Sequence, residues 1–284
     1  MTIRVEMSLD NFAQSGETTR GEITKLANQS GGKVANIIRD PNTGKVVFVN
    51  LTFPDGTNQA AIDAVIANKG VATVIQFPKV LLDQKFDGMT VGADLPPANA
   101  YGSWFKDPTI SSSFAVANDQ SVSSPNALKS VHSGTGTSIE QARLYFQLQT
   151  APISAGRVME YEFNLRTTFW PAVAGIFFEF KATEAAYLTT NFRFFGFGTG
   201  LLKLQGSTWP GMIVPAGSWH NLKVQHEVGT PDALVFLDGS PQTPITDHVI
   251  ESSDVSVLFI DSGSNGGSSA RSMWVDDIKW TILS

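Results

Sequence analysis

From Lys85 to the C-terminus, apolar and polar residues alternate in short runs, and Gly, Pro, Asn and Ser separate these runs. A period of two places successive side chains on opposite faces of a strand, so such runs predict half-buried β-strands. Many short strands at this spacing are typical of an antiparallel sandwich. The strands expected here are residues 114–117, 126–131, 142–148, 157–165, 175–181, 191–196, 201–204, 221–228, 233–237, 255–260 and 272–282.

The clearest local pattern in this region is a hairpin near the C-terminus. Residues 219–224 and 234–239 are apolar-alternating runs, and the turn residues 228–232 lie between them. Asp238-Gly239 is expected to end the second run with another tight turn, because this dipeptide favours two-residue turns. A closing strand follows at residues 273–280.

The first 80 residues have a different pattern, because helical spacing appears between the strands. Strands are expected at 2–9, 34–40, 46–53 and 71–77, and helices at 17–28 and 58–69. This order, β-α-β-β-α-β, is that of a ferredoxin-like domain. The segment has no His, no Cys and no Gly-rich phosphate loop, so residues 1–80 are interpreted as a docking or oligomerising module. Residues 78–83 are expected to link it to a second domain, residues 84–284.

The composition is that of a folded chain with two domains. The chain has 284 residues, of which 42% are hydrophobic, and this suffices for packed cores. It contains no Cys, which excludes disulfides and thiolate metal sites. The start of the chain lacks the basic and apolar runs of a secretory signal, and no apolar stretch approaches the roughly 20 residues that span a bilayer. A membrane partner is therefore not expected.

Negative charge is concentrated in the second domain. Residues 1–80 carry eight Lys or Arg and seven Asp or Glu, so the other 12 basic and 19 acidic residues give a net charge of −7, against −6 for the whole chain. An acidic surface repels phosphate backbones, so a nucleic-acid partner is not expected.

Four short segments, in this order, resemble the opening and closing strands of concanavalin A-like (laminin-G/lectin-type) jelly rolls. They are Phe86-Asp87-Gly88 with Leu95-Pro96-Pro97 and Trp104, the segment 123–130, the hairpin at 219–239, and the closing strand 273–280. The resemblance covers residues 84–284 and implies a mainly-β chain with a C-terminal antiparallel jelly-roll sandwich. Such domains usually bind glycans or decorate surfaces, and only some are enzymes, so the resemblance indicates fold rather than function.

In this family the first and last strands often lie side by side and share a structural calcium ion. The resemblance would place Asp87 and one of Asp276 or Asp277 at such a site, and calcium takes several oxygen ligands, carboxylates among them. The alternative is that Asp276 and Asp277 form the exposed polar step of an edge strand. No cofactor is required by any other feature of the sequence.

Two tryptophans lie beside turn residues and are candidates for sugar binding. Trp170 precedes Pro171, and Trp209 precedes Pro210. A ring presented on a loop can stack on a sugar while polar neighbours bond its hydroxyls. The alternative is that both rings cover the ends of the sandwich.

The strand that contains Glu160, Glu162 and Asn164 is the segment most like an enzyme site. Its alternation places these three polar residues on one face. Two carboxylates facing one groove could act as acid and nucleophile in glycoside hydrolysis, or could hold a sugar. The laminarinase-type pattern E-[IL]-D-[IL]-x-E, however, is absent, and a strand with one solvated face is the favoured explanation of the alternation.

Polysaccharide lyases of this fold use three further strand patterns: Arg-Thr-Glu-x-Arg, Gln-x-His and Tyr-x-Lys-x-Gly-x-Tyr. Residues 165–168 and 224–226 match only fragments of the first two, and the third is missing. His220 and His226 are interpreted as partly buried residues at the rim of the sandwich. His132 and His248 have no evident partner, so no metal triad is predicted. The chain is therefore predicted not to be an enzyme.

These features favour a virion structural protein, of the capsid-decorating (cement or head-fibre) type found in bacteriophages, with the jelly roll exposed on the virion surface. Such a protein reaches the outside of the cell without a secretory signal. Residues 1–80 would dock on the major capsid protein or another virion protein, and the chain would form a homo-oligomer, with a trimer expected. The alternatives are an extracellular carbohydrate-binding adhesin, a phage receptor-binding (tail) protein and, with less support, a glycoside hydrolase or polysaccharide lyase.

Overall fold

A computed structural model of the chain describes most of its strands and many of its loops. The described residues are 3–8, 24–25, 28, 31–39, 46–54, 57–58, 60, 62, 73–106, 114–123, 125–132, 140–150, 152–168, 176–181, 190–197, 200–204, 207–247, 254–264 and 271–283. The chain forms two compact units, Met1–Lys79 with Ile282–Ser284, and Val80–Thr281. Among the described residues, no helix is long and apolar enough to cross a membrane.

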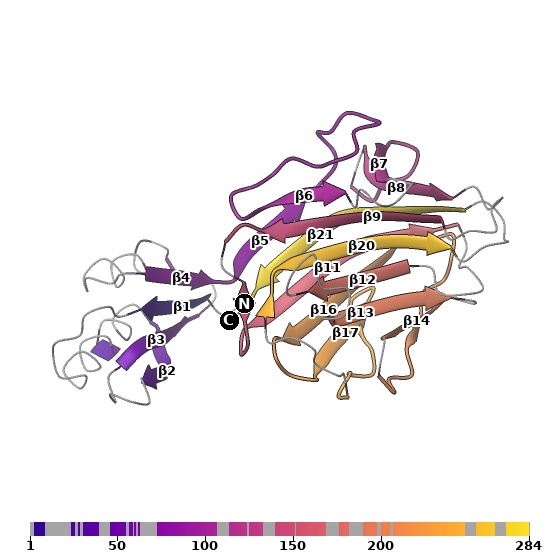
Figure 1. Ribbon diagram of the computed structural model, residues 1–284. Helices are drawn as coiled ribbons and strands as arrows, with labels where there is room; N and C mark the ends of the chain where they lie inside the picture. The colour runs from indigo at the N-terminus through magenta and orange to yellow at the C-terminus, as the bar shows by residue number, and fades with distance from the viewer. Residues whose placement is uncertain are drawn as a thin grey trace. The chain divides into compact units, whose positions relative to one another are not determined.

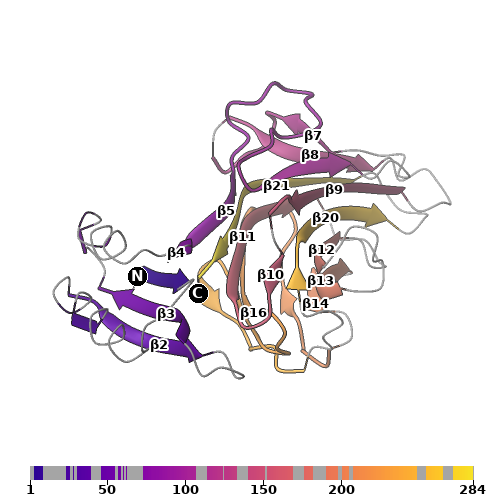
Figure 2. The ribbon, with the colours of Figure 1, turned by 60° about the vertical axis from the view of Figure 1, so that its left-hand side comes forward.

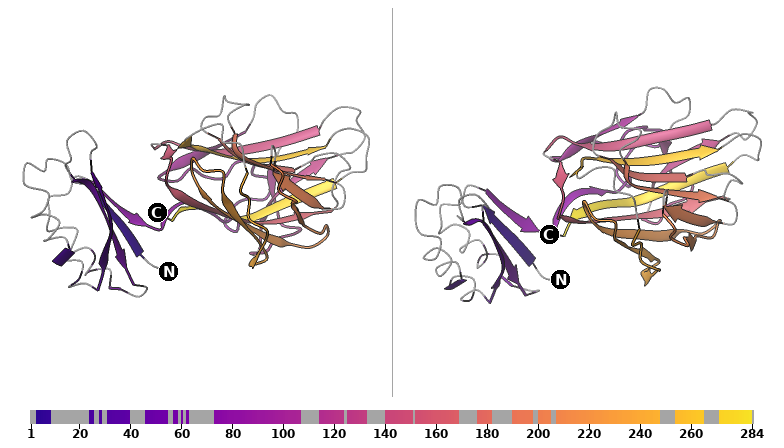
Figure 3. Two further views of the ribbon diagram at one scale, coloured as in Figure 1. Left: turned by 90° about the horizontal axis from the view of Figure 1, so that it is seen from below. Right: turned by 60° about the horizontal axis from the view of Figure 1, so that its bottom comes forward.

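The smaller unit contains one four-stranded antiparallel sheet, whose strands lie side by side in Figure 3. The strand order is β2-β3-β1-β4, with bounds Lys33–Arg39 (β2), Val46–Phe53 (β3), Ile3–Ser8 (β1) and Thr73–Phe77 (β4). Helical residues lie between β1 and β2 and between β3 and β4. This order confirms the ferredoxin-like arrangement, although most of the two predicted helices lies outside the described residues. Leu51, Phe53 and Ile62 have no exposed surface and form its core.

The first sheet of the larger unit has eight strands and carries both ends of the unit. Its order is β18-β17-β16-β11-β21-β8-β7, and β5 also pairs with β21 (Figure 1). The first and last strands of the unit are therefore neighbours, as expected. The bounds are Lys79–Gln84 (β5), Phe114–Ala117 (β7), Ala127–His132 (β8), Val158–Thr167 (β11), His220–Glu227 (β16), Ala233–Leu237 (β17), Ser240–Pro241 (β18) and Arg271–Ile282 (β21).

The second sheet has seven strands in the order β15-β14-β13-β12-β20-β9-β6. Strand β20 lies between β9 and β12 although both precede it by many residues (Figures 1 and 2). The bounds are Gly102–Lys106 (β6), Glu140–Leu148 (β9), Ile176–Lys181 (β12), Thr190–Phe197 (β13), Leu201–Leu204 (β14), Met212–Ile213 (β15) and Val257–Ser264 (β20). A separate short pair joins Ile153–Ser154 (β10) to Asp254–Val255 (β19).

Aromatic side chains fill the core between the two sheets. Phe146 of the second sheet meets Trp104 edge-on, with 5.4 Å between ring centroids, and meets Trp280 of the first sheet at 6.5 Å. These rings are buried, and burial of large apolar side chains is the main force that holds two sheets together. The prediction of a mainly-β sandwich with a small α+β unit is confirmed.

Two local predictions need correction. Residues 78–83 were expected to be a link, but Lys79–Gln84 is strand β5, and Leu81 and Leu82 are buried. The closing strand β21 is not an edge strand, because it lies between β11 and β8. The alternative that Asp276 belongs to an exposed polar step is therefore wrong, and Asp276 has no exposed surface.

The hairpin at β16 and β17 forms as predicted, and its second turn shows the conformation that Asp-Gly favours. Leu222 pairs with Leu237, and Leu237 pairs with Ser240 across the turn. Asp238 and Gly239 both have positive φ, 50° and 76°. Two left-handed residues give the twist that joins neighbouring strands through a two-residue loop.

Candidate functional site

The outer face of β11, β16 and β17 carries three rows of polar and apolar side chains, here called the β11–β17 face. On β11, Tyr161, Phe163 and Leu165 are buried in the sandwich, so the residues between them face outward. Across the strands, the rows run Glu160–Gln225–Leu234, Glu162–Lys223–Phe236 and Asn164–Asn221. The alternation of β11 predicted the outward position of Glu160 and Glu162, whereas their neighbours follow from strand pairing.

One lysine lies close to both Glu160 and Glu162 on this face. Lys223 Nζ lies 3.7 Å from Glu160 Oε2 and 3.4 Å from Glu162 Oε2. Gln225 Nε2 donates a hydrogen bond to Glu160 Oε2 at 2.8 Å. The positive charge is therefore shared by two acids, and the three charges together leave one negative charge without a partner.

An apolar wall borders these charges on β17. Leu234 is 48% exposed, and Phe236 is partly exposed beside Lys223. A depression of about 270 Å³ lies over this region, and its lining residues are Glu162, Asn221, Lys223, Gln225, Phe236 and Gly239. An aromatic ring, amides and charged groups thus meet at one shallow site.

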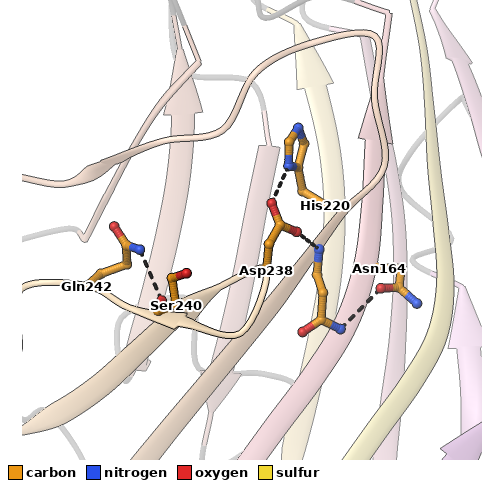
Figure 4. Close-up of polar contacts among 6 residues, drawn as sticks. Asn164, His220, Asp238, Ser240 and Gln242 are labelled. Atoms are coloured by element: carbon orange, nitrogen blue, oxygen red, sulfur yellow. Dashed lines mark hydrogen bonds and ion pairs between the residues drawn. The ribbon is translucent and has the colours of Figure 1, made fainter.

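A hydrogen-bonded chain closes one end of the face (Figure 4). The Asp238 carboxylate accepts hydrogen bonds from His220 Nδ1 at 2.9 Å and from the Asn221 N–H at 2.8 Å. Asn221 Nδ2 donates to Asn164 Oδ1 at 3.1 Å, and Asn164 Nδ2 donates to Asp277 Oδ2 at 3.0 Å. Burial opposes the charge of Asp238, but the bonds from His220 and Asn221 outweigh it and hold the pKa of Asp238 below its usual value.

The same hydrogen-bonded chain continues at Asp277 on β21. Asp277 has a positive φ of 49°, and its N–H donates to Asp276 Oδ1 at 2.9 Å. The two adjacent aspartates face different surroundings. Asp277 contacts Asn164 on the β11–β17 face, whereas Asp276 is fully buried.

The structure brings Asp276 and Asp87 together around Ser123, whereas the Asp277 carboxylate contacts Asn164. Asp276 Oδ2 accepts hydrogen bonds from the N–H groups of Val122 at 2.9 Å and Ser123 at 3.2 Å. Ser123 Oγ lies 3.4 Å from Asp87 Oδ1 and 3.4 Å from both oxygens of Asp276. Burial, with a smaller contribution from the charge of Asp277, raises the pKa of Asp276 to about 6 against the effect of the N–H bonds from Val122, Asp277 and Ser123.

These residues do not fit a calcium ion without rearrangement. The carbonyls of Phe86, Asp87 and Met89 converge beside the aspartates, but Asn126 Nδ2 donates to all three, at 3.4, 3.4 and 2.9 Å. An amide group therefore occupies the point where a cation would meet these oxygens. Within the described ranges, no group of three or more His, Cys, Asp or Glu side chains converges as a metal site. Calcium binding stays a prediction.

Of the two tryptophans predicted to stack on sugars, Trp209 is not at the β11–β17 face. Trp209 is only 3% exposed, its ring packs edge-on against Phe194, and its Nε1 donates to the Thr243 carbonyl at 2.8 Å. The structure therefore places Trp209 in the core, where its ring has no surface for a sugar. Trp170 lies outside the described residues.

The described histidines are buried or partly buried. His226 is 2% exposed and contacts the Asp232 carbonyl through Nδ1 at 3.1 Å. His220 Nε2 is shielded from solvent and has no partner in the described part of the chain, so it cannot take a proton directly from a ligand on the face. His132 is buried between the sheets, 2.7 Å from Ser262 Oγ. His220 is partly buried as predicted, whereas His226 is fully buried rather than partly buried, and His248 lies outside the described residues.

Sequence reasoning missed Lys223, Gln225 and Phe236, which complete the site. All three alternate with buried residues on β16 and β17. This signal was available in the sequence, because the hairpin was predicted and its outward positions follow from the period of two. The pairing of β16 with β11 was not available, since the two strands are about 60 residues apart.

The sequence matches no family model and no curated protein. Among solved structures, the fold is similar to that of an endo-β-1,4-glucuronan lyase from the fungus Trichoderma reesei, with a TM-score of 0.50 and 13% identity over 66% of this chain and 93% of that one. A sialidase aligns with a TM-score of 0.49 and 9% identity over 88% of this chain, which spans only 22% of the sialidase's length. Alginate lyase Aly36B aligns with a TM-score of 0.44 and 8% identity over 73% of this chain and 97% of that one.

At these identities the likeness is one of fold alone. It supports the jelly-roll sandwich, a fold that carbohydrate-binding and carbohydrate-active proteins use, and it identifies neither the concanavalin A-like family nor a phage decoration protein. The prediction that the chain is not an enzyme is contradicted, because a lyase has this fold over nearly all of its length. That prediction rested on the missing laminarinase-type pattern and on the incomplete lyase patterns, and other residues can carry catalysis on the same fold.

Proposed function

We propose that the larger unit binds a hydroxyl-rich glycan on the β11–β17 face. The observation that carries this proposal is the row Glu162–Lys223–Phe236, in which a carboxylate, an ammonium group and an aromatic ring lie on neighbouring strands. An aromatic ring gives a sugar apolar contact area, and carboxylates, amides and ammonium groups form hydrogen bonds with hydroxyls. The depression of about 270 Å³ above the row offers room for the ligand.

The fold adds support for a carbohydrate ligand. The endo-β-1,4-glucuronan lyase shares the sandwich architecture at a TM-score of 0.50. The virion-surface location, the homo-oligomer and the docking role of residues 1–80 stay predictions, and the extracellular adhesin or receptor-binding protein stays their alternative. Each of these settings is compatible with glycan binding on an exposed face.

The proposal is tested by screening the full chain against a glycan array and measuring the affinity of each positive glycan by calorimetry. We expect Phe236→Ala to weaken binding about tenfold or more, because the stacking surface is lost. Phe105→Ala is the matched control, since Phe105 is an exposed ring (38%) on β6 in the other sheet, and it should leave the affinity unchanged. Absence of binding by the wild-type chain, or equal loss in both variants, would contradict the proposal.

Cleavage of the bound glycan is a second candidate activity at the same face. The observation that favours it is the pair of carboxylates Glu160 and Glu162, both within 4 Å of Lys223 Nζ, because two carboxylates are what glycoside hydrolysis commonly requires. It is tested by assaying release of reducing ends from a polysaccharide panel. Activity that disappears in Glu162→Gln while glycan binding persists would establish the reaction. A wild-type chain that binds glycan but does not cleave it would show that the face binds glycan without catalysis.

A further inference from the structure

The charges of the β11–β17 face and its border are unequal in number. Five acidic residues lie on this face or at its ends: Glu160, Glu162, Glu227, Asp238 and Asp277. Three basic residues accompany them: Lys223, Arg166, which alternates with the buried residues of β11, and Lys279, which alternation places on the same side of β21 as Asp277. With His220 counted as neutral, five acidic against three basic residues leave a net charge of −2. A ligand on this face therefore meets a negative potential.

The lysine that lines the depression already has two carboxylate partners. Lys223 Nζ lies within 4 Å of both Glu160 and Glu162. A ligand carboxylate that approached Lys223 would also approach these two carboxylates, and like charges at this distance repel. The one cation in the lining of the depression is thus unable to serve as a receptor for an acidic sugar.

The hydrogen-bonding groups of the face favour ligands that donate. When ionised, the glutamates and the aspartates of the face accept hydrogen bonds and cannot donate them. Gln225 Nε2 and Asn221 Nδ2 already donate to Glu160 and Asn164. Sugar hydroxyls can donate to the remaining acceptor positions, whereas a uronic-acid carboxylate brings a further acceptor and a further negative charge.

We infer that the β11–β17 face selects uncharged, hydroxyl-rich glycans against polymers of uronic acids, and that Glu160 and Glu162 are the residues that determine this selectivity. The inference rests on the proposed glycan binding and names its ligand class. Neutralising both glutamates leaves Lys223 without these two partners and changes the summed charge of Glu160, Glu162 and Lys223 from −1 to +1. The Glu160→Gln/Glu162→Gln variant should therefore gain affinity for uronic-acid polymers.

The test compares the affinities of the full chain for neutral glucans, galactans and arabinans with those for polyglucuronate, alginate and polygalacturonate of matched length. We expect the wild-type chain to bind a neutral glycan at least tenfold more tightly than any uronic-acid polymer. The double Gln variant should bind uronic-acid polymers at least tenfold more tightly than the wild type does. The matched control is Asp94→Asn/Asp119→Asn, which removes the same charge from two other carboxylates paired with lysines, Lys106 and Lys129. It should leave the affinities for neutral glycans and for uronic-acid polymers unchanged.

The possible results distinguish this inference from the proposed glycan binding on which it rests. Wild-type binding of uronic-acid polymers as tightly as of neutral glycans overturns the inference and leaves glycan binding intact. Absence of binding to every glycan overturns both. If the double variant does not fold, the salt dependence of the wild-type chain decides, because a repulsive face should bind uronic-acid polymers more tightly at high salt than at low salt. The opposite salt dependence would overturn the inference.

Discussion

At the scale of single residues, Asp276 shows how burial changes the chemistry of a carboxyl group. It has no exposed surface, it lies next to Asp277 in the chain, and its pKa is raised to about 6. In the unfolded chain an aspartate has a pKa of about 3.9. At a pH between these two pKa values, Asp276 is protonated in the folded protein and ionised in the unfolded chain. The folded protein therefore binds more protons than the unfolded chain in this range.

The sign of the resulting pH dependence follows from this difference. The free energy of unfolding should fall by about 1–3 kcal/mol as the pH rises from about 4 to about 6, and this contribution should then stay constant. Asp276→Asn cannot ionise, so the stability of this variant relative to the wild type should rise over the same range. The measurement is urea unfolding across this pH range with EDTA present.

The control for this prediction is Asp83→Asn, because Asp83 is an exposed carboxyl on β5. Its stability relative to the wild type should not change over the same pH range. A difference between Asp276→Asn and the wild type that is independent of pH would show that folding does not raise the pKa of Asp276 and would contradict the argument.

At the scale of elements, Asn126 joins the turn at residues 86–89 to the start of β8. Its side-chain amide donates to the carbonyls of Phe86, Asp87 and Met89, and Asn126 is 5% exposed. Asn126→Ala should lower the free energy of unfolding by about 1–3 kcal/mol, because the three carbonyls lose the hydrogen bonds of a buried amide. Gln242→Ala, which removes an exposed amide that donates to the Ser240 carbonyl, should have little effect in the same urea unfolding measurement.

The same position tests whether an amide stands in the place of a cation. Asn126→Asp would direct a carboxylate at three carbonyl oxygens, so it should destabilise the protein more than Ala does. Calcium should raise the Tm of this variant, because the ion would then have carboxylates and carbonyls as ligands. A wild-type Tm that rises equally with calcium would show that the ion displaces Asn126, and would overturn the interpretation of the amide.

At the scale of the whole sandwich, one buried hydrogen bond joins the two sheets. His132 of β8 lies 2.7 Å from Ser262 Oγ of β20, and both side chains are at most 1% exposed. Ser262→Ala should lower the free energy of unfolding by about 1–3 kcal/mol, because the imidazole loses a partner in a dry environment. The control is Ser103→Ala, since Ser103 Oγ accepts from Gln149 in an exposed position. Equal losses in the two variants would contradict a special role for the contact between the sheets.

Much of the architecture of the larger unit could be predicted from local patterns. The bounds of β7, β14 and β17 were predicted without error, and the Asp238-Gly239 turn follows from the left-handed conformations that these residues tolerate. Strand β5 was missed because Pro78 and the charged residues around it are typical of a link. Its strand conformation depends on pairing with β21, about 190 residues later, and no local pattern contains that partner.

The sequence by itself determined which side chains of each strand share a face and where the chain turns, because alternation and turn chemistry act between neighbours in the chain. It placed Glu160 and Glu162 outward for this reason. Only the tertiary structure decided that Lys223 lies against both glutamates, that Trp209 is buried, and that β21 lies inside its sheet so that Asp276 loses contact with water. Strand pairing, burial and charge pairing join segments far apart in the chain, so they depend on which strands become neighbours in the folded sheet.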